Sequence, residues 1–173
     1  MNRAIFATFL ILTATTATAQ TPYAGMQART VKALSEQQVA DLRDGRGMGL
    51  ALAAELNGYP GPSHVLELAD QLKLSAEQRA GIQRLFDAMK AEAMPLGARL
   101  IGQEGDLDRQ FATRTVTPES LKASTAAVAA TQGALRETHL RYHLSTVAVL
   151  SPAQLQRYAE LRGYAARPMH HHH

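Results

Sequence analysis

The sequence of 173 residues contains no cysteine and no tryptophan, and only 5% of its residues are aromatic. Without cysteine, the chain has neither disulfide bonds nor a thiolate for catalysis or metal binding. Few aromatic residues argue against a β-sandwich, whose strands favour them. Alanine, leucine, glutamine and arginine are plentiful instead, and these residues favour helices. The expected fold class is therefore all-α, with helices packed on helices.

Strong net charge and long apolar runs are also missing. The formal net charge is +3, which is too small for a strong nucleic-acid binder. The one marked apolar run, residues 4–12, follows the basic Arg3 and precedes the small residues Ala17-Thr18-Ala19. This pattern predicts a signal peptide over residues 1–19, too short to span a membrane. We expect an exported protein that has no integral membrane segment after the signal peptide is cleaved.

One short pattern, Leu-Ser-x-x-Gln, occurs three times. The copies are Leu34-Ser35-Glu36-Gln37-Gln38, Leu74-Ser75-Ala76-Glu77-Gln78 and Leu150-Ser151-Pro152-Ala153-Gln154. In a capping box, the serine hydroxyl accepts a hydrogen bond from an amide of the first helical turn, and the glutamine side chain accepts one from the amide of the serine. Each copy therefore predicts a helix start, and together they indicate a repeated helical architecture.

The apolar spacing between these starts predicts two long helices joined by a short bend. The expected helices are 36–56 with a glycine-rich break at 45–49, a short helix at 63–72, long helices at 76–111 and from 117 to about 149, and a last short helix from 152. Two long helices with a short bend pack antiparallel. The expected architecture is an elongated antiparallel helical hairpin with short flanking helices.

The same pattern divides the chain into segments. Residues 20–62 are expected to form an N-terminal extension with one helix and a Gly/Pro-rich turn, residues 63–164 the helical domain, and residues 165–173 a flexible histidine-rich tail. So thin a hairpin has little core per residue. Apolar surface left on one face favours a partner, most simply a second copy of the chain in a homodimer.

His139 and His143 are four residues apart and share one face of the predicted second long helix, where two imidazoles can chelate a transition metal. The candidates for further ligands are Glu137, His64, Met48 and Met94. The alternative is that His139 is a core histidine hydrogen-bonded across the hairpin, with His143 on the surface beside it. A divalent metal such as Zn, Ni, Co or Cu is the only cofactor that these residues suggest, and none is required.

Other features favour a binding protein over an enzyme. The sequence shows no nucleophile–histidine–acid order, no paired catalytic carboxylates and no nucleotide-binding loop. Four arginines between apolar positions, Arg84, Arg99, Arg136 and Arg141, are interpreted either as a solvated face or as a cradle for acidic or unfolded proteins. The histidines at positions 170–173 are either an affinity tag or a native metal-binding tail.

The predicted signal peptide, the absence of cysteine and the repeated boxes resemble the Spy/CpxP-like periplasmic family, whose signature is Leu-Thr-x-x-Gln. The matching residues are Leu74, Ser75 and Gln78, and again Leu150, Ser151 and Gln154, with serine in place of threonine. The resemblance covers residues 63–163 and implies an all-helical, cradle-shaped dimer in the periplasm. The copy at Leu34 lies ahead of the part of the chain that resembles the family.

The resemblance implies two functions. Some members of the family are ATP-independent chaperones or envelope-stress modulators, which bind unfolded or envelope proteins on a concave face. Others sense heavy metals through paired histidines in the first helix and His-x-x-x-Met in the last long helix. This chain has only His64 in the first region and His139 with His143 in the second, so the metal ligands do not carry over residue by residue. Chaperone or modulator is the preferred function, and metal sensor or resistance protein the alternative.

Overall fold

The structure is a computed structural model and describes residues 23–164. The predicted signal peptide at 1–19 and the histidine-rich tail at 165–173 lie outside the described residues. The elements are a 3-10 turn, Met26–Ala28, and the helices α1 (Glu36–Arg43), α2 (Leu52–Glu55), α3 (Pro62–Glu67), α4 (Ala76–Ala112), α5 (Pro118–Val147) and α6 (Pro152–Leu161). No strand occurs between residues 23 and 164, and the expected all-α class is confirmed.

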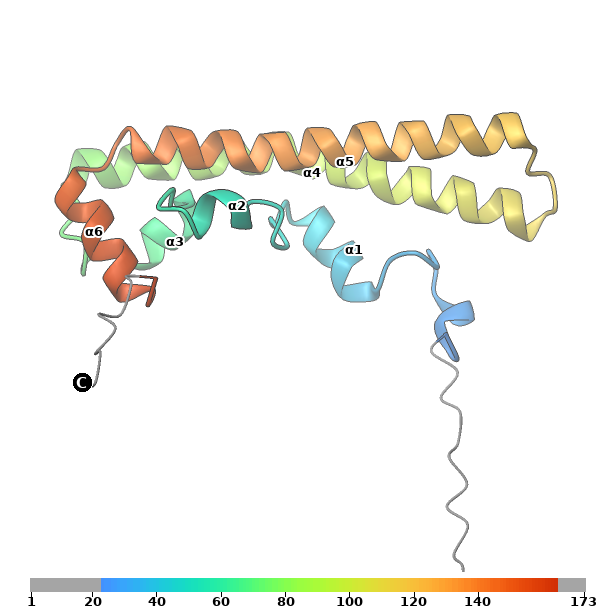
Figure 1. The fold of residues 1–173 in the computed structure, drawn as a ribbon, viewed down its shortest axis with the longest axis horizontal. Coiled ribbons are helices and arrows are strands. Elements are labelled where there is room, and N and C mark those ends of the chain that lie inside the picture. The colour runs from blue at the N-terminus through green and yellow to red at the C-terminus, as the bar shows by residue number, and fades with distance from the viewer. Residues whose placement is uncertain (1–22, 165–173) are drawn as a thin grey trace, which may run out of the picture.

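The two long helices form the predicted antiparallel hairpin (Figure 1). α4 has 37 residues and α5 has 30, which correspond to lengths of about 55 and 45 Å at a rise of about 1.5 Å per residue. α6 turns back across the open end of the hairpin, while α1, α2 and α3 lie along the same side of it (Figure 1). The hairpin is therefore covered on one side and open on others.

All three predicted capping boxes form. Ser35, Ser75 and Ser151 each accept a hydrogen bond from the backbone of the glutamine three residues on, at 3.1, 3.1 and 3.3 Å respectively. Each glutamine side chain in turn accepts a hydrogen bond from the N–H of its cap residue. A fourth box, Thr117 with Ser120, starts α5. The sequence pattern therefore marks the starts of α1, α4 and α6 to the residue.

The N-terminal segment differs from the single interrupted helix that the sequence predicts. Two separate helices, α1 and α2, flank the glycine-rich stretch, where Gly45 and Gly49 have φ values of +67° and +82°. Such angles end a helix, and glycine adopts them without steric cost. The segment also packs directly on the hairpin, because a Cβ at Gly97 of α4 would lie only 2.2 Å from the Leu42 carbonyl oxygen. Residues 36–62 are thus an integral layer of the fold.

Two hydrophobic clusters hold these layers together. At the open end of the hairpin, Val65, Leu72, Ile82, Leu150 and Tyr158 join α3, α4 and α6. Further along, Leu42 of α1 packs against Ala93, Leu100 and Leu135 of α4 and α5. The first cluster closes one end of the hairpin, and the second docks α1 along its length.

The buried stripe of α5 includes polar side chains. Gln132 is exposed, whereas Thr131 and Thr138 are buried. His143, expected on the surface, is also buried, with 7% of its surface exposed. The reason is that α5 contacts α4 and also α2 and α3 of the N-terminal segment, so it buries a stripe wider than one coiled-coil seam.

Candidate functional site

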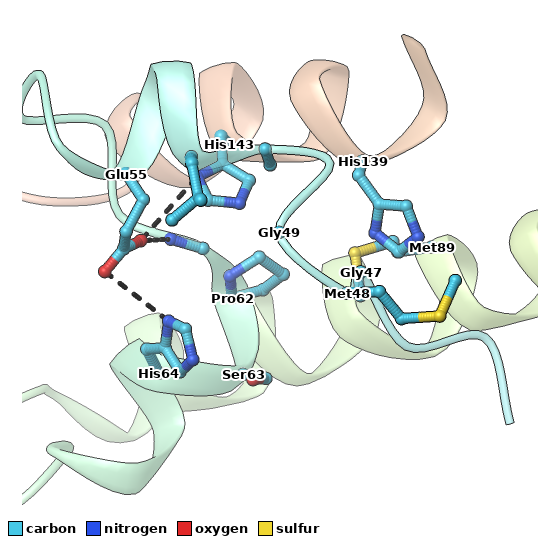
Figure 2. Close-up of a pocket in the computed structure, with 13 residues that line it drawn as sticks. Gly47, Met48, Gly49, Glu55, Pro62, Ser63, His64, Met89, His139 and His143 are labelled. Carbon is cyan, nitrogen blue, oxygen red and sulfur yellow. Dashed lines mark hydrogen bonds and ion pairs between the residues drawn. The ribbon is translucent and has the colours of Figure 1, made fainter. Parts of the chain in front are cut away.

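A cavity of about 230 Å³ lies where the N-terminal segment crosses the hairpin. The glycine-rich stretch 47–49 and the turn at 61–64 form one wall, and α4 and α5 form the other. The polar and sulfur-containing side chains of its lining come from Met48, Glu55, Ser63, His64, Met89, His139 and His143. Figure 2 shows two groups among these side chains: Glu55 with His64 and His143 on one side, and His139 with Met48 and Met89 on the other.

Glu55, at the end of α2, is the most connected group of the site. Only 4% of its surface is exposed. Its carboxylate accepts a hydrogen bond from the Tyr158 hydroxyl of α6 and one from the Gly61 N–H at 3.1 Å. His64 Nδ1 lies 3.5 Å away, and Arg162 Nε lies 3.7 Å away. Glu55 therefore ties α2 to α3 and to α6.

The electrostatics of this cluster favour an ionised carboxylate. Burial by itself raises the pKa of Glu55, but hydrogen bonds from His64, Tyr158 and Gly61 outweigh it and lower the pKa to about 2. Burial and the hydrogen bond to Glu55 raise the pKa of Tyr158, so its hydroxyl keeps its proton. Glu55 is thus a permanent negative charge beneath the surface at neutral pH.

His143 lies beside this carboxylate and binds the backbone of the turn before α3. Its Nδ1 is 2.6 Å from the Tyr59 carbonyl oxygen; since a carbonyl oxygen only accepts, Nδ1 carries the proton. The same nitrogen is 3.8 Å from Glu55 Oε2. A Cβ at Gly61 would come within 2.8 Å of Nε2, so this face of the ring packs against backbone. In this structure His143 links α5 to the turn before α3.

His139 occupies the other end of the cavity, one turn earlier on α5. Only 2% of its surface is exposed, and its Nε2 is buried without a hydrogen-bond partner. Burial, and secondarily the neighbouring His143, lowers the pKa of His139, so the imidazole is neutral at pH 7. The expected hydrogen bond of His139 across the hairpin is absent at this nitrogen. Figure 2 shows the ring directed toward Met48 and Met89 instead.

The structure does not assemble the predicted metal ligands into one cluster. Glu137 accepts a hydrogen bond from Arg141 at 3.0 Å and lies outside the cavity lining. His64 and His143 face Glu55, while His139 faces the glycine-rich stretch (Figure 2). Within residues 23–164, no group of three or more histidine, aspartate or glutamate side chains is arranged to hold a metal ion. A site built from His139, His143, Glu137 and His64 stays a prediction.

The four arginines predicted to bind clients have different surroundings. Arg136 lines an apolar hollow of about 500 Å³ between α1 and the hairpin, whose walls include Leu34, Leu50 and Leu100. It also lines a second hollow of about 410 Å³ on α5, beside Leu140, Leu144 and Arg141. Arg84 and Arg99 are exposed on α4 and line neither hollow. The structure therefore singles out Arg136.

Arg141 is engaged within the hairpin. Its guanidinium donates to Glu92 of α4 at 2.6 Å and to Glu137 at 3.0 Å. The Tyr142 hydroxyl donates to the other oxygen of Glu92 at 2.6 Å. Hydrogen bonds to both glutamates raise the pKa of Arg141. This arginine links α4 to α5 through two of its N–H donors.

The two boxes that start α4 and α6 contact each other. The Gln78 amide donates to Gln154 Oε1 at 2.9 Å, and the Gln154 amide donates to Gln78 Oε1 at 3.0 Å. The Gln78 amide also donates to the Val149 carbonyl oxygen, just before α6, and the Gln154 amide donates to the Leu72 carbonyl oxygen, just before α4. The repeated spacing of serine and glutamine in the pattern thus fixes a helix-to-helix contact as well as two helix starts.

Sequence reasoning missed Glu55 and its partners Tyr158 and Gly61. A single glutamate at the end of a four-residue helix resembles any surface residue, and its burial depends on α6, about 100 positions away. The one sequence feature that pointed to this site was the Gly-Pro pair 61–62, because a glycine allows another group to pack closely against the backbone.

Comparison with known proteins identifies the part of the chain that carries the fold. The model of the LTXXQ motif family matches residues 62–162, which run from α3 to α6 and include both paired boxes. No significant match was found among curated proteins or solved structures. In the part of the chain that the structure describes, no helix combines the length and apolar character needed to cross a bilayer. With the matched region covering more than half of the sequence, the chain belongs to the LTXXQ motif family.

Proposed function

We propose that the protein is an ATP-independent binding protein of the periplasm that holds unfolded or partner envelope proteins on its helical hairpin, as a chaperone or envelope-stress modulator. The proposal fits the family membership and the all-helical fold. It also fits a sequence without a nucleotide-binding loop, because holding a client needs surface complementarity and no energy source. The expected assembly is a homodimer.

The observation that carries the proposal is the pair of apolar hollows on either side of Arg136. Both are lined mainly by apolar atoms, and both include Gly133 and Arg136. Leu144, in the second hollow, leaves 59% of its surface exposed. The two hollows share the exposed cation of Arg136, and the Arg141–Glu137 ion pair lies at the edge of the second. Such an apolar surface with a shared cation suits a polypeptide that presents apolar and acidic side chains.

The shape of the molecule supports the same function. Large apolar side chains are also exposed near the far end of the hairpin, where Phe111 and Leu121 leave 55% and 38% of their surfaces uncovered. Binding energy spread over several shallow apolar contacts allows many different partners, because no single pocket demands one side chain. A rigid hairpin presents those contacts without an ordering cost of its own.

The test is suppression of aggregation of a reduced client protein, in buffer without ATP, with the four terminal histidines replaced by serine. The unmodified surface is expected to suppress light scattering at one dimer per client. Arg136→Glu is expected to weaken suppression of an acidic client several-fold. Arg99→Glu is the matched control, because it makes the same charge change on an exposed arginine outside both hollows. Equal effects of the two variants, or no suppression by the original chain, would contradict the proposal.

A further inference from the structure

The cavity beneath the glycine-rich stretch contains a second set of ligand atoms beside the carboxylate network. Three side chains gather at its inner end: His139 from α5, Met89 from α4 and Met48 from the loop (Figure 2). His139 and Met89 expose only 2% and 6% of their surfaces. None of the three takes part in the Glu55 network or lines the Leu140–Leu144 hollow.

The first observation is the unsatisfied imidazole. His139 Nε2 is buried and has no hydrogen-bond partner in the described residues. A buried polar atom left without a partner costs about 1–3 kcal/mol, and such an atom in a native structure calls for a ligand, a water molecule or an ion. The walls next to the ring offer thioether sulfur and glycine backbone.

The second observation is the conformation of Met48. Its φ of +44° lies in the left-handed region, which non-glycine residues rarely adopt. Met48 stands between Gly47 and Gly49, where a third glycine would remove the strain. Strained residues of this kind gather at ligand clamps, because the bound state repays the strain. The strained backbone holds the Met48 side chain at the mouth of the cavity, with 41% of its surface exposed.

We propose that His139, Met48 and Met89 form a binding site for a soft monovalent metal ion, Cu(I), in the cavity between the glycine-rich stretch and the hairpin. One imidazole and two thioethers are neutral ligands, and soft thioether sulfur favours Cu(I), which imidazole also suits. The set differs from the histidine and carboxylate ligands that the sequence suggests. Met48 also lines the hollow between α1 and the hairpin, but Cu(I) affinity is measured without a client, so the two proposals fail separately.

In this proposal the two histidines at i and i+4 on α5 have different roles. His143 uses its Nδ1 on the Tyr59 carbonyl and packs Nε2 against Gly61. His143 then positions other parts of the site. It holds the turn before α3 against α5, and residues of that turn line the same cavity as His139. The metal ligand on α5 is His139 alone.

The experiment is a Cu(I) titration in competition with the chromogenic chelator bicinchoninate, under reducing and anaerobic conditions. The chain carries serine in place of His170 to His173, which removes the terminal histidines. One Cu(I) per chain is expected to bind. Met48→Leu and Met89→Leu keep side-chain volume but remove sulfur, and each is expected to weaken binding by at least the roughly 10–100-fold seen when outer-shell groups of metal sites are changed. Met94→Leu is the matched control, because Met94 is exposed on α4 and does not line the cavity.

A second measurement tests the ligands in the otherwise unsubstituted chain, independently of how the variants fold. The X-ray absorption spectrum of the Cu(I)-loaded protein is expected to show sulfur as well as nitrogen scattering. Absence of Cu(I) binding, equal affinity of the leucine variants and the starting chain, or a spectrum with nitrogen scattering alone would overturn the proposal. In those cases His139 is a core histidine that binds a buried water molecule.

Discussion

Gln78 and Gln154 exchange two hydrogen bonds, each donating its side-chain amide to the oxygen of the other. The same oxygens accept the N–H groups of Ser75 and Ser151 at 3.1 and 2.9 Å. Because each amide also reaches a backbone carbonyl, both side chains use all of their donors and accept two hydrogen bonds each. A glutamine at this position therefore does two things at once: it closes its own capping box and binds the box of the other helix.

Removing either glutamine should destabilise the protein more than an ordinary cap loss. Gln78→Ala or Gln154→Ala is expected to lower the free energy of unfolding by about 1–3 kcal/mol, because the remaining amide is left half-satisfied. The double variant should cost less than the sum of the two. Urea denaturation followed by circular dichroism measures all three.

The matched control for this pair is Gln38→Ala. Gln38 closes the same kind of box on α1 but is exposed, and its loss should cost no more than about 1 kcal/mol. Strict additivity of Gln78→Ala and Gln154→Ala would show that the reciprocal contact contributes nothing.

Gly97 should tolerate no side chain. In Gly97→Ala the new methyl group would meet the Leu42 carbonyl, so α1 must move away from α4, at a cost of about 1–3 kcal/mol typical of overpacking. Gly102→Ala, five residues along the same helix, meets nothing within 4 Å and should stabilise α4 by up to about 1 kcal/mol. Thermal unfolding of the two variants is expected to shift in opposite directions. Shifts of the same sign would mean that α1 is not seated on α4 in solution.

Glu55 should make stability depend on pH in a defined window. Its pKa is about 2 in the folded protein against an ordinary 4.5, so the folded state favours the ionised form by on the order of 3 kcal/mol. Since the folded pKa is the lower one, this contribution is complete above about pH 5 and disappears as the pH falls toward 2. The free-energy gap between the original chain and Glu55→Gln should therefore be widest at neutral pH and close on acidification. A gap that stays constant with pH would contradict the ionised network.

Arg141 should matter little for stability although it makes two ion pairs. Its side chain and those of Glu92 and Glu137 are 44–63% exposed, and exposed ion pairs contribute about 0–1 kcal/mol. Arg141→Gln is expected to leave the midpoint of urea denaturation almost unchanged, and any remaining effect should fade in 1 M salt. A shift as large as that of Gln78→Ala, persisting in high salt, would mean that the pair is far less solvated than its exposure indicates.

Local rules were enough to predict the starts of the capped helices, but not the separate helix α2 or the end of α3, which stops at Glu67 and not at the predicted residue 72. Each serine or threonine that starts a long or capped helix has a side-chain partner three residues later, so the starts of α1, α4, α5 and α6 follow from nearest neighbours in the chain. The hairpin follows from the short bend at residues 113–117. The packing of the N-terminal segment could not be predicted in the same way, because the fit of Leu42 against Gly97 joins residues 55 positions apart.

The candidate site was predicted only in part, for the same reason. His139 and His143 were identified by their spacing, and both are buried next to one cavity. Their different orientations depend on which piece of the N-terminal segment lies opposite, Gly47 or Gly61. Glu55 was not identified, since a carboxylate that three distant elements surround has no local pattern. Spacing along a helix indicates which side chains share a face, while the partner across the interface decides what they can bind.

The two capping boxes that contact each other lie at only one end of the hairpin. This asymmetry sets the order in which α4 and α5 should separate on unfolding. The end opposite the bend is held by the glutamine pair and by the cluster around Ile82 and Tyr158. Toward the bend, side chains such as Phe111 are largely exposed, and the Gln110–Ser124 hydrogen bond at 3.0 Å crosses between the helices. Amide protons near the bend should exchange with deuterium soonest, and those near residue 82 last. The two helices would then stay together longest at the end opposite the bend and separate first toward the bend, where the short loop limits how far they can move apart.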